Sequence, residues 1–252
     1  FASYKILSLY YLGRLLLSIG YDIIVYLALK QKIINFKFFL FIILLCALFQ
    51  SFLAIAQVKV ESDLNLKYFG EPQLEILNLR GQELPRGIAK FDFSGGKILR
   101  AYGTFPHPNV LGLFLIIGLI CLIILFTYEF SFIHRLLLIF SGYIISFGII
   151  LSFSRIALLS LFIIFLYILI KNFTPKRVLL TLGTLFILTL LILFNFPNYK
   201  NSIKSHAYDF YSSPSVINRL NYNKLGLEII YLKPFGVGIG NQVIYSVEND
   251  LY

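Results

Sequence analysis

Three arginines, Arg100, Arg155 and Arg219, each lie in or beside a polar turn of a very apolar chain. A planar guanidinium binds phosphate oxygens through two parallel hydrogen bonds and stays charged at any relevant pH. Three such groups on one face would suit a diphosphate, which carries charge on both phosphoryl groups. The alternative for Arg100 and Arg219 is a solvated surface side chain, and for Arg155 a side chain that reaches water from within an apolar run.

The stretch from Arg100 to Asn109, Arg-Ala-Tyr-Gly-Thr-Phe-Pro-His-Pro-Asn, leads a polar loop directly into an apolar run. Gly103, Pro106 and Pro108 favour a fixed turn, because their backbone angles are special or restricted. His107 could act as a general base near neutral pH, or it could be only a turn residue. The stretch therefore has the composition of a built polar site.

The elements that must position these residues are membrane spans. The chain is 58% hydrophobic and only 13% charged, and several apolar runs approach the roughly 20 residues needed to cross a bilayer. This composition predicts an all-α integral membrane protein, a polytopic helical bundle set in a lipid bilayer. Six spans are expected: Ile6–Leu29, Phe38–Val58, Asn109–Tyr128, Leu136–Phe153, Ile156–Ile170 and Val178–Phe196.

The boundary at Ser152–Arg155 follows from length. A single helix from Leu136 to Ile170 would be about 52 Å long, whereas the hydrocarbon core is roughly 30 Å thick. We therefore predict a break there, although no Gly or Pro marks it. Arg155 would then lie slightly inside the membrane boundary and face protein or water, since an unpaired charge in lipid costs roughly 2.5 to 3.5 kcal/mol.

The net charge of +10 is concentrated in two short loops. Lys30–Lys37 carries three lysines and Lys171–Arg177 three basic residues, and neither holds an acid. Residues 59–107 hold seven basic against six acidic side chains, and residues 197–252 five against four, so each nets +1. Short basic loops mark the cytoplasmic side, which puts the long segments on the periplasmic face. The charge is thus a topology signal, and nucleic acid is not expected as a partner.

These assignments divide the chain into four segments. Residues 1–58 hold the first two spans, residues 59–107 a periplasmic loop, residues 108–196 four spans, and residues 197–252 the start of a large periplasmic loop.

Each long loop contains one expected element. Residues 87–93 and 97–102 flank Ser94–Gly96, which predicts a β-hairpin that carries Arg100. Val216–Lys233 is long enough for an amphipathic helix, which Pro234 would end. The following glycines, Gly236, Gly238 and Gly240, lack the spacing of a dinucleotide-binding loop and are interpreted as a tight turn.

No metal site or cofactor is expected. Cys46 and Cys121 both lie in apolar runs, so neither a disulfide nor a thiolate metal site is predicted. The chain contains no Met and starts at Phe1 inside an apolar stretch, which predicts an internal fragment or a trimmed chain.

Three features together resemble the bacterial O-antigen ligase and O-antigen polymerase family. They are the stretch Arg100–Asn109 before a span, Ser154-Arg155-Ile-Ala-Leu at a span boundary, and Arg219 followed by Lys233-Pro-Phe-Gly-Val-Gly-Ile-Gly-Asn241. Their order, spacing and shared outer face carry the resemblance, which extends over most of the chain from the second span onward.

The resemblance implies a C-type glycosyltransferase of the bacterial inner membrane. Such an enzyme moves a glycan from undecaprenyl diphosphate to a lipid A core or glycan acceptor on the periplasmic face, without nucleotide sugar or metal. Arg155 and Arg219 fall where family arginines are thought to hold the lipid-linked diphosphate. The residues that match the family motifs around them are Arg100, Gly103, Pro108, Asn109, Gly236, Gly238 and Gly240.

The catalytic base is expected elsewhere. Position 107 varies within the family, which weakens the case for His107. Family members carry a histidine in the large periplasmic loop beyond the glycine-rich turn, so the base is expected after Tyr252, and the chain as given is not expected to turn over.

The alternative is a non-enzymatic polytopic membrane protein, such as an anion or polysaccharide transporter, in which the arginines line an anion path. Transport predicts interrupted, repeated helices and a site at the membrane midplane. Here the motifs gather at one face. Ligase and polymerase share the donor chemistry and differ in the acceptor, so the sequence does not separate them.

Overall fold

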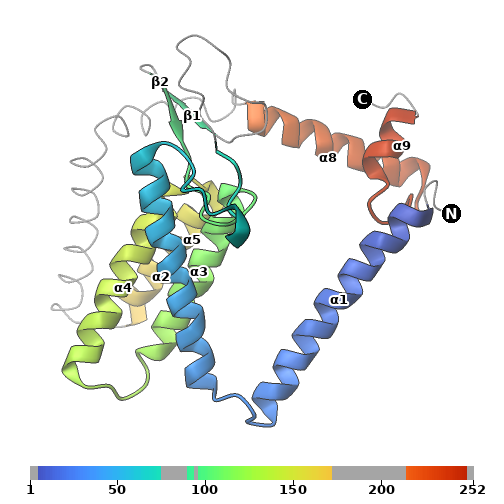
Figure 1. Ribbon diagram of the computed structural model, residues 1–252. Helices are drawn as coiled ribbons and strands as arrows, with labels where there is room; N and C mark the ends of the chain where they lie inside the picture. The colour runs from blue at the N-terminus through green and yellow to red at the C-terminus, as the bar shows by residue number, and fades with distance from the viewer. Residues whose placement is uncertain (1–4, 75–89, 94–95, 172–213, 249–252) are drawn as a thin grey trace. The chain divides into compact units, whose positions relative to one another are not determined.

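The computed structural model describes residues 5–74, 90–93, 96–171 and 214–248. Within these residues, four helices are long and apolar enough to cross a membrane: α1 (Lys5–Lys30), α2 (Phe36–Val60), α3 (Pro108–Leu125) and α4 (Phe132–Leu151) (Figure 1). The prediction of an all-α, polytopic membrane protein is confirmed. The chain divides into two compact units, residues 36–205 and residues 1–35 with 206–252.

The helix boundaries lie close to the predicted spans. Each end of α1 to α4 lies within four residues of the first four predicted spans. The fifth predicted span is α5 (Arg155–Lys171), whose 17 residues make it shorter than the other four. At 1.5 Å per residue it is about 25 Å long, less than the roughly 30 Å core of a bilayer. The sixth, Val178–Phe196, lies outside the described residues.

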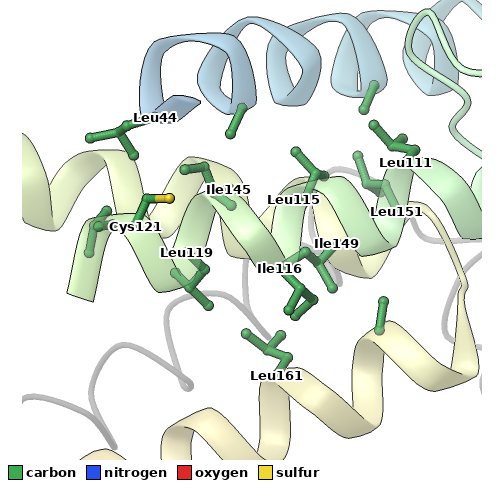
Figure 2. Packing of buried hydrophobic residues seen from close by; sticks show 14 of the residues in the cluster. Leu44, Leu111, Leu115, Ile116, Leu119, Cys121, Ile145, Ile149, Leu151 and Leu161 are labelled. Atoms are coloured by element: carbon green, nitrogen blue, oxygen red, sulfur yellow. The ribbon is translucent and has the colours of Figure 1, made fainter. Parts of the chain in front are cut away.

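The core of the unit 36–205 surrounds α3, which packs against α2, α4 and α5. Figure 2 shows leucine and isoleucine side chains of α3 directed between side chains of its three neighbours. Those labelled on α3 include Leu111, Leu115, Ile116 and Leu119, and their neighbours are Leu44 of α2, Ile145 and Ile149 of α4, and Leu161 of α5. This packing holds the ends of four helices in fixed relative positions.

Small residues let these helices approach one another closely. A Cβ atom added at Gly118 of α3 would lie 2.3 Å from the Cβ of Ala47 on α2. One added at Gly148 of α4 would lie 2.9 Å from Oγ of Ser51, also on α2. Because lipid tails are as apolar as leucine, membrane helices associate through such close packing rather than through exclusion from water.

A hairpin leads to the stretch that begins at Arg100. Strand β1 (Lys90–Phe93) pairs antiparallel with β2 (Gly96–Leu99), with Lys90 opposite Leu99. The expectation that the second strand continues through Tyr102 is wrong. The N–H of Ala101 donates to the carbonyl of Leu151 and that of Tyr102 to Oε1 of Gln57, so the backbone leaves the hairpin and joins the helical bundle.

The other unit contains α1, α8 (Pro214–Leu232) and α9 (Gln242–Glu248). The predicted helix Val216–Lys233 is present as α8. Leu225 and Ile229 of α8 pack against Val237 and Tyr245. Other apolar side chains of α8 are exposed, including Leu220, Leu227 and Tyr231. An amphipathic helix would keep its apolar residues on the packed face, and α8 does not.

Candidate active site

Arg100 follows β2 directly, and its guanidinium is held by two parts of the bundle. Its Nε donates to the backbone carbonyl of Ser152, at 3.0 Å, and its Nη2 donates to Oδ1 of Asn109, at 2.9 Å. Ser152 follows α4, and Asn109 is the second residue of α3. Since a guanidinium is a planar, rigid fork, two hydrogen bonds to fixed partners set its orientation as well as its position.

The turn between α4 and α5 carries Arg155. The predicted break is confirmed: α4 ends at Leu151 and α5 begins at Arg155. Phe153 has φ +46°, a left-handed backbone conformation that glycine adopts more readily than any other residue. Arg155 is half-buried and lies three residues after Ser152, whose carbonyl Arg100 binds. The structure therefore brings Arg100 to the turn that leads into Arg155.

Two serine side chains form hydrogen bonds with the backbone at the end of α4 and the start of α5. The hydroxyl of Ser152 donates to the carbonyl of Ile149, at 2.7 Å. Oγ of Ser154 accepts the N–H of Ala157, at 3.5 Å, as an N-cap residue does. Both serines are buried, so these bonds provide partners for polar groups in an apolar setting.

Gln57 of α2 holds the backbone after Arg100. Its Oε1 accepts the N–H groups of Tyr102 and Gly103, at 3.1 and 2.8 Å. Its Nε2 donates to the carbonyl of Gly103, at 2.9 Å, and to Oε1 of Glu71, at 2.6 Å. Gln57 is fully buried, so the loop is anchored from inside the protein.

Glu71 is the buried end of this network. Its Oε1 also accepts the N–H of Leu64, at 2.9 Å, and its Oε2 accepts that of Leu66, at 2.7 Å. These residues lie between α2 and a 3-10 helix, η1 (Lys67–Phe69). The carboxylate thus ties the segment after α2 to Gln57.

Gln50 holds the loop two residues further on. Its Oε1 accepts the N–H of Thr104, at 2.9 Å, and its Nε2 donates to the hydroxyl of Thr104, at 2.8 Å. Gly103 has φ +59°, and a Cβ atom there would lie 2.3 Å from Oε1 of Gln50. Both the backbone conformation and the close approach require glycine at this position.

The sequence reasoning missed Gln50, Gln57 and Glu71. A signal was present, because Gln50 and Gln57 are seven residues apart in an otherwise apolar span and so lie on the same helix face. A polar side chain in a membrane helix needs a partner, and two on one face predict a polar neighbour. The identity of that neighbour depends on packing and is not legible in the sequence.

His107 and Pro108 start α3. His107 is the N-cap residue, and its Nδ1 accepts the N–H of Asn109, at 3.1 Å. Pro108 occupies the first helical position, where the missing N–H costs no hydrogen bond. Because Nδ1 accepts, the proton of the neutral ring lies on Nε2. The structure thus shows His107 as a cap, and its role as a base stays a prediction.

The opposite end of this bundle is basic and aromatic. Nζ of Lys37, at the start of α2, lies 4.1 Å from the ring centroid of Phe130 and 5.5 Å from that of Tyr128. Arg135, in the first turn of α4, is exposed at the same end. The ends of the bundle therefore differ: Arg100 and Arg155 lie at one, and Lys37 and Arg135 at the other.

The remaining candidate residues lie in the other unit. Arg219 is exposed on α8, and its predicted place beside Arg155 stays a prediction. Gly236, Gly238 and Gly240 have φ values of +81°, +96° and +81° between α8 and α9. They form the tight turn that the sequence indicated.

Across residues 5–74, 90–93, 96–171 and 214–248, no three or more His, Cys, Asp or Glu side chains are grouped so that they could hold a metal ion.

Part of the chain matches a known protein family. The family model of O-antigen ligases matches residues 140–252. This segment belongs to the O-antigen ligase family. The ligase segment contains Arg155, Arg219 and the glycine turn, whereas Arg100–Asn109 lies before it. No curated protein matches the chain, and no solved structure matches it.

The family resemblance predicted from the sequence is therefore confirmed. At the level of the family, the match indicates O-antigen ligase-type function in lipopolysaccharide biosynthesis. Together with the spanning helices, it identifies a multi-pass membrane protein.

Proposed function

We propose that this protein transfers a glycan from an undecaprenyl-diphosphate-linked donor to a lipid A core or glycan acceptor. The acceptor hydroxyl attacks the anomeric carbon, and the bond from that carbon to the diphosphate oxygen breaks. The diphosphate leaves with the bonding electron pair, and the hydroxyl proton passes to a general base. No base is assigned here, because Nδ1 of His107 is engaged in capping α3.

The arginines neutralise the charge that develops on the leaving diphosphate and hold it in line for the attack. Such electrostatic stabilisation and positioning are the largest contributions a protein can make to a transfer of this kind. Arg155 binds one phosphoryl group, and Arg100 supports the site from the adjoining loop. The family resemblance suggests that Arg219, also in the ligase segment, contributes to diphosphate binding. The reaction as proposed requires neither metal nor cofactor.

The observation that carries the proposal is the clamp on Arg100. Its guanidinium is held against the carbonyl of Ser152, in the turn that leads into Arg155 of the ligase segment. Two cationic side chains at one end of an apolar bundle create a positive potential that favours the binding of an anion there. A diphosphate is an anion of suitable charge, and two planar guanidinium groups suit its oxygens.

We place this end on the periplasmic face of the bacterial inner membrane. The opposite end carries Lys37 and Arg135, and the loop from Lys30 to Lys37 is basic without an acid. Basic residues in short loops favour the cytoplasmic side. The diphosphate site would then open to the periplasm, where the lipid-linked donor is displayed.

Arg155→Lys tests the proposal in membranes from cells that express the full gene product. We expect glycan transfer from lipid-linked donor to fall roughly a hundredfold, as when one oxyanion-stabilising donor is removed. Lysine keeps the charge but not the two-point contact with phosphate. Transfer is measured as product per amount of inserted protein.

Arg135→Lys is the matched control, since Arg135 is an exposed arginine at the opposite end of the bundle. Its transfer rate should equal that of the parent. If Arg155→Lys and Arg155→Ala also transferred glycan at the parental rate, Arg155 would be a boundary side chain that only reaches water, and its leaving-group role would be abandoned.

A further inference from the structure

The Gln57 amide uses its full hydrogen-bonding capacity inside the protein. An amide oxygen can accept two bonds and an amide nitrogen can donate two. Oε1 of Gln57 accepts from Tyr102 and Gly103, and Nε2 donates to Gly103 and Glu71. The partners settle which way the amide points, because the carboxylate of Glu71 and the carbonyl of Gly103 can only accept.

We infer that Gln57, with its amide oriented by Glu71, is a positioning residue for the diphosphate site. It fixes the backbone at Tyr102 and Gly103, and through that backbone it sets the place of the Arg100 guanidinium. The inference rests on the proposed function and adds the residues that align its arginine. Gln57 does not touch the donor; it acts through the loop.

The loop needs such an anchor because its backbone forms no regular structure. Backbone groups at membrane depth must find partners in the protein. Gln57 and Gln50 supply them from α2, and the carbonyl of Leu151, at the end of α4, accepts the N–H of Ala101 at 3.1 Å. The segment directly after Arg100 is therefore fixed from two helices at once.

The two glutamines differ in what their partners can do. Nε2 of Gln50 donates to the hydroxyl of Thr104, which can turn and donate instead. Nε2 of Gln57 faces Oε1 of Glu71 at 2.6 Å and the carbonyl of Gly103 at 2.9 Å, and neither can donate. The same substitution, Gln to Glu, should therefore be accommodated at position 50 and should cause repulsion at position 57.

The experiment compares Gln57→Glu with Gln50→Glu in the membrane transfer assay. For Gln57→Glu we expect kcat/KM to fall on the order of a hundredfold, as a small misplacement of a catalytic group can cause. For Gln50→Glu we expect a loss of less than about tenfold, because the hydrogen bonds to Thr104 can be remade. Equal losses at the two positions would overturn the inference.

Gln73→Glu is the control for added charge. Gln73 is exposed and lies two residues from Glu71, so the variant brings the same charge close to the network without entering it. Its kcat/KM should equal the parental value. A loss as large as that of Gln57→Glu would mean that charge alone, rather than the orientation of the amide, lowers transfer.

Combination with Arg100→Lys separates positioning from general stability. If Gln57 acts only through Arg100, then Gln57→Glu should lower transfer much less in the Arg100→Lys background than in the parent. Losses that multiply would show that Gln57 acts independently of Arg100. That result would overturn the inference.

Hydrogen exchange of the backbone amides gives a readout that does not depend on turnover. Gln57→Glu should speed exchange in residues 100–107 and leave α3 and α4 unchanged. Faster exchange throughout these helices would mean general loosening and would contradict a positioning role. If Gln57→Glu fails to insert into the membrane, Glu71→Gln replaces it. The new NH2 group at position 71 must face a hydrogen-bond donor, because both carboxylate oxygens of Glu71 accept hydrogen bonds. Unchanged exchange and transfer in Glu71→Gln would overturn the inference.

The two proposals fail in different ways. If Arg100→Lys and Arg155→Lys both transfer glycan at the parental rate, the proposed function falls, whatever Gln57 does. If both arginine variants lose transfer while Gln57→Glu retains it, only the positioning role of Gln57 falls.

Discussion

Two glycine-containing turns precede helices in this protein, and they are held in different ways. The turn before α3, residues 100–107, is bonded to distant residues: Gln50 and Gln57 on α2, and Leu151 and Ser152 at the end of α4. The turn before α9 is held by local bonds. The N–H of Gly236 donates to the carbonyl of Lys233 at 2.8 Å, and Nδ2 of Asn241 donates to that of Val237 at 3.1 Å.

The difference separates a turn whose hydrogen bonds reach distant elements from a turn whose hydrogen bonds are local. A turn held by tertiary hydrogen bonds acquires its geometry only when the bundle has assembled, so it can place a charge such as Arg100 against another element. A turn held by its own residues can form from local sequence. The glycines accordingly have different tasks, since Gly103 needs both its φ and its lack of a side chain, whereas Gly236 has open space around it.

The largest effect that tests this comparison is expected from Gly103→Ala. Alanine at φ +59° costs roughly 1 to 2 kcal/mol. Its Cβ must also displace Gln50, which would lose its bonds to Thr104 at a further 1 to 3 kcal/mol, roughly. We expect the free energy of unfolding in detergent micelles to fall by about 3 kcal/mol.

Gly236→Ala is the matched variant in the local turn. It meets the same left-handed backbone, with φ +81°, but no atom within 4 Å of the new Cβ. Only the conformational cost of about 1 kcal/mol should remain. Equal losses for the two variants, measured by the same unfolding titration, would show that the tertiary anchoring of the first turn contributes nothing.

The same contrast explains what the sequence could predict. The spans followed from apolar runs, and the break before Arg155 followed from the length a single helix would need. The turn at Gly236–Gly240 is local, and its glycines were sufficient to indicate it. The anchoring of the loop by Gln57 was missed, because it depends on which faces of α2, α3 and α4 meet. No local pattern records that a glutamine amide will bind the backbone of Gly103.

The extent of the second strand was predicted wrongly for a related reason. The segments on either side of Ser94–Gly96 predicted a strand that reaches Tyr102, and the bundle instead takes the N–H groups of Ala101 and Tyr102. Tertiary partners competed successfully with the hairpin for these groups. The predicted place of Arg219 beside Arg155 stays a prediction, because Arg219 lies in the other compact unit.

A smaller effect is expected from Asn109→Asp. This variant keeps an acceptor for the guanidinium of Arg100 and adds a negative charge beside it. The carboxylate still accepts from Nη2 of Arg100, and an acid in the first turn of α3 interacts favourably with the helix dipole. Stability should therefore be unchanged or slightly higher. Transfer should fall on the order of tenfold, because the new negative charge opposes binding of a diphosphate.

Ser131→Asp is its control. Ser131 is exposed at the N-terminus of α4, at the opposite end of the bundle, so it adds the same charge to a helix start away from Arg100. It should leave transfer unchanged. If Asn109→Asp transferred glycan as fast as Ser131→Asp, the loop before α3 would not lie beside the bound anion, and its distant anchors would serve only the fold.

The smallest expected effect is a difference between two variants of a third turn, between α4 and α5, where Phe153 rather than glycine has the positive φ of +46°. Removing its buried ring should cost about 3 kcal/mol in Phe153→Ala, as for other aromatic residues in a core. In a helix or strand, glycine is less stable than alanine by roughly 0.5 to 1 kcal/mol. At Phe153 the order should reverse, with Phe153→Gly about 1 kcal/mol more stable than Phe153→Ala, because only alanine keeps the left-handed strain. Unfolding titrations of the two variants in one detergent decide the sign. If the alanine variant were as stable as the glycine variant, the turn leading into Arg155 would have relaxed to negative φ. The geometry of this turn would then come from its local sequence, as in the turn before α9, and not from the surrounding helices.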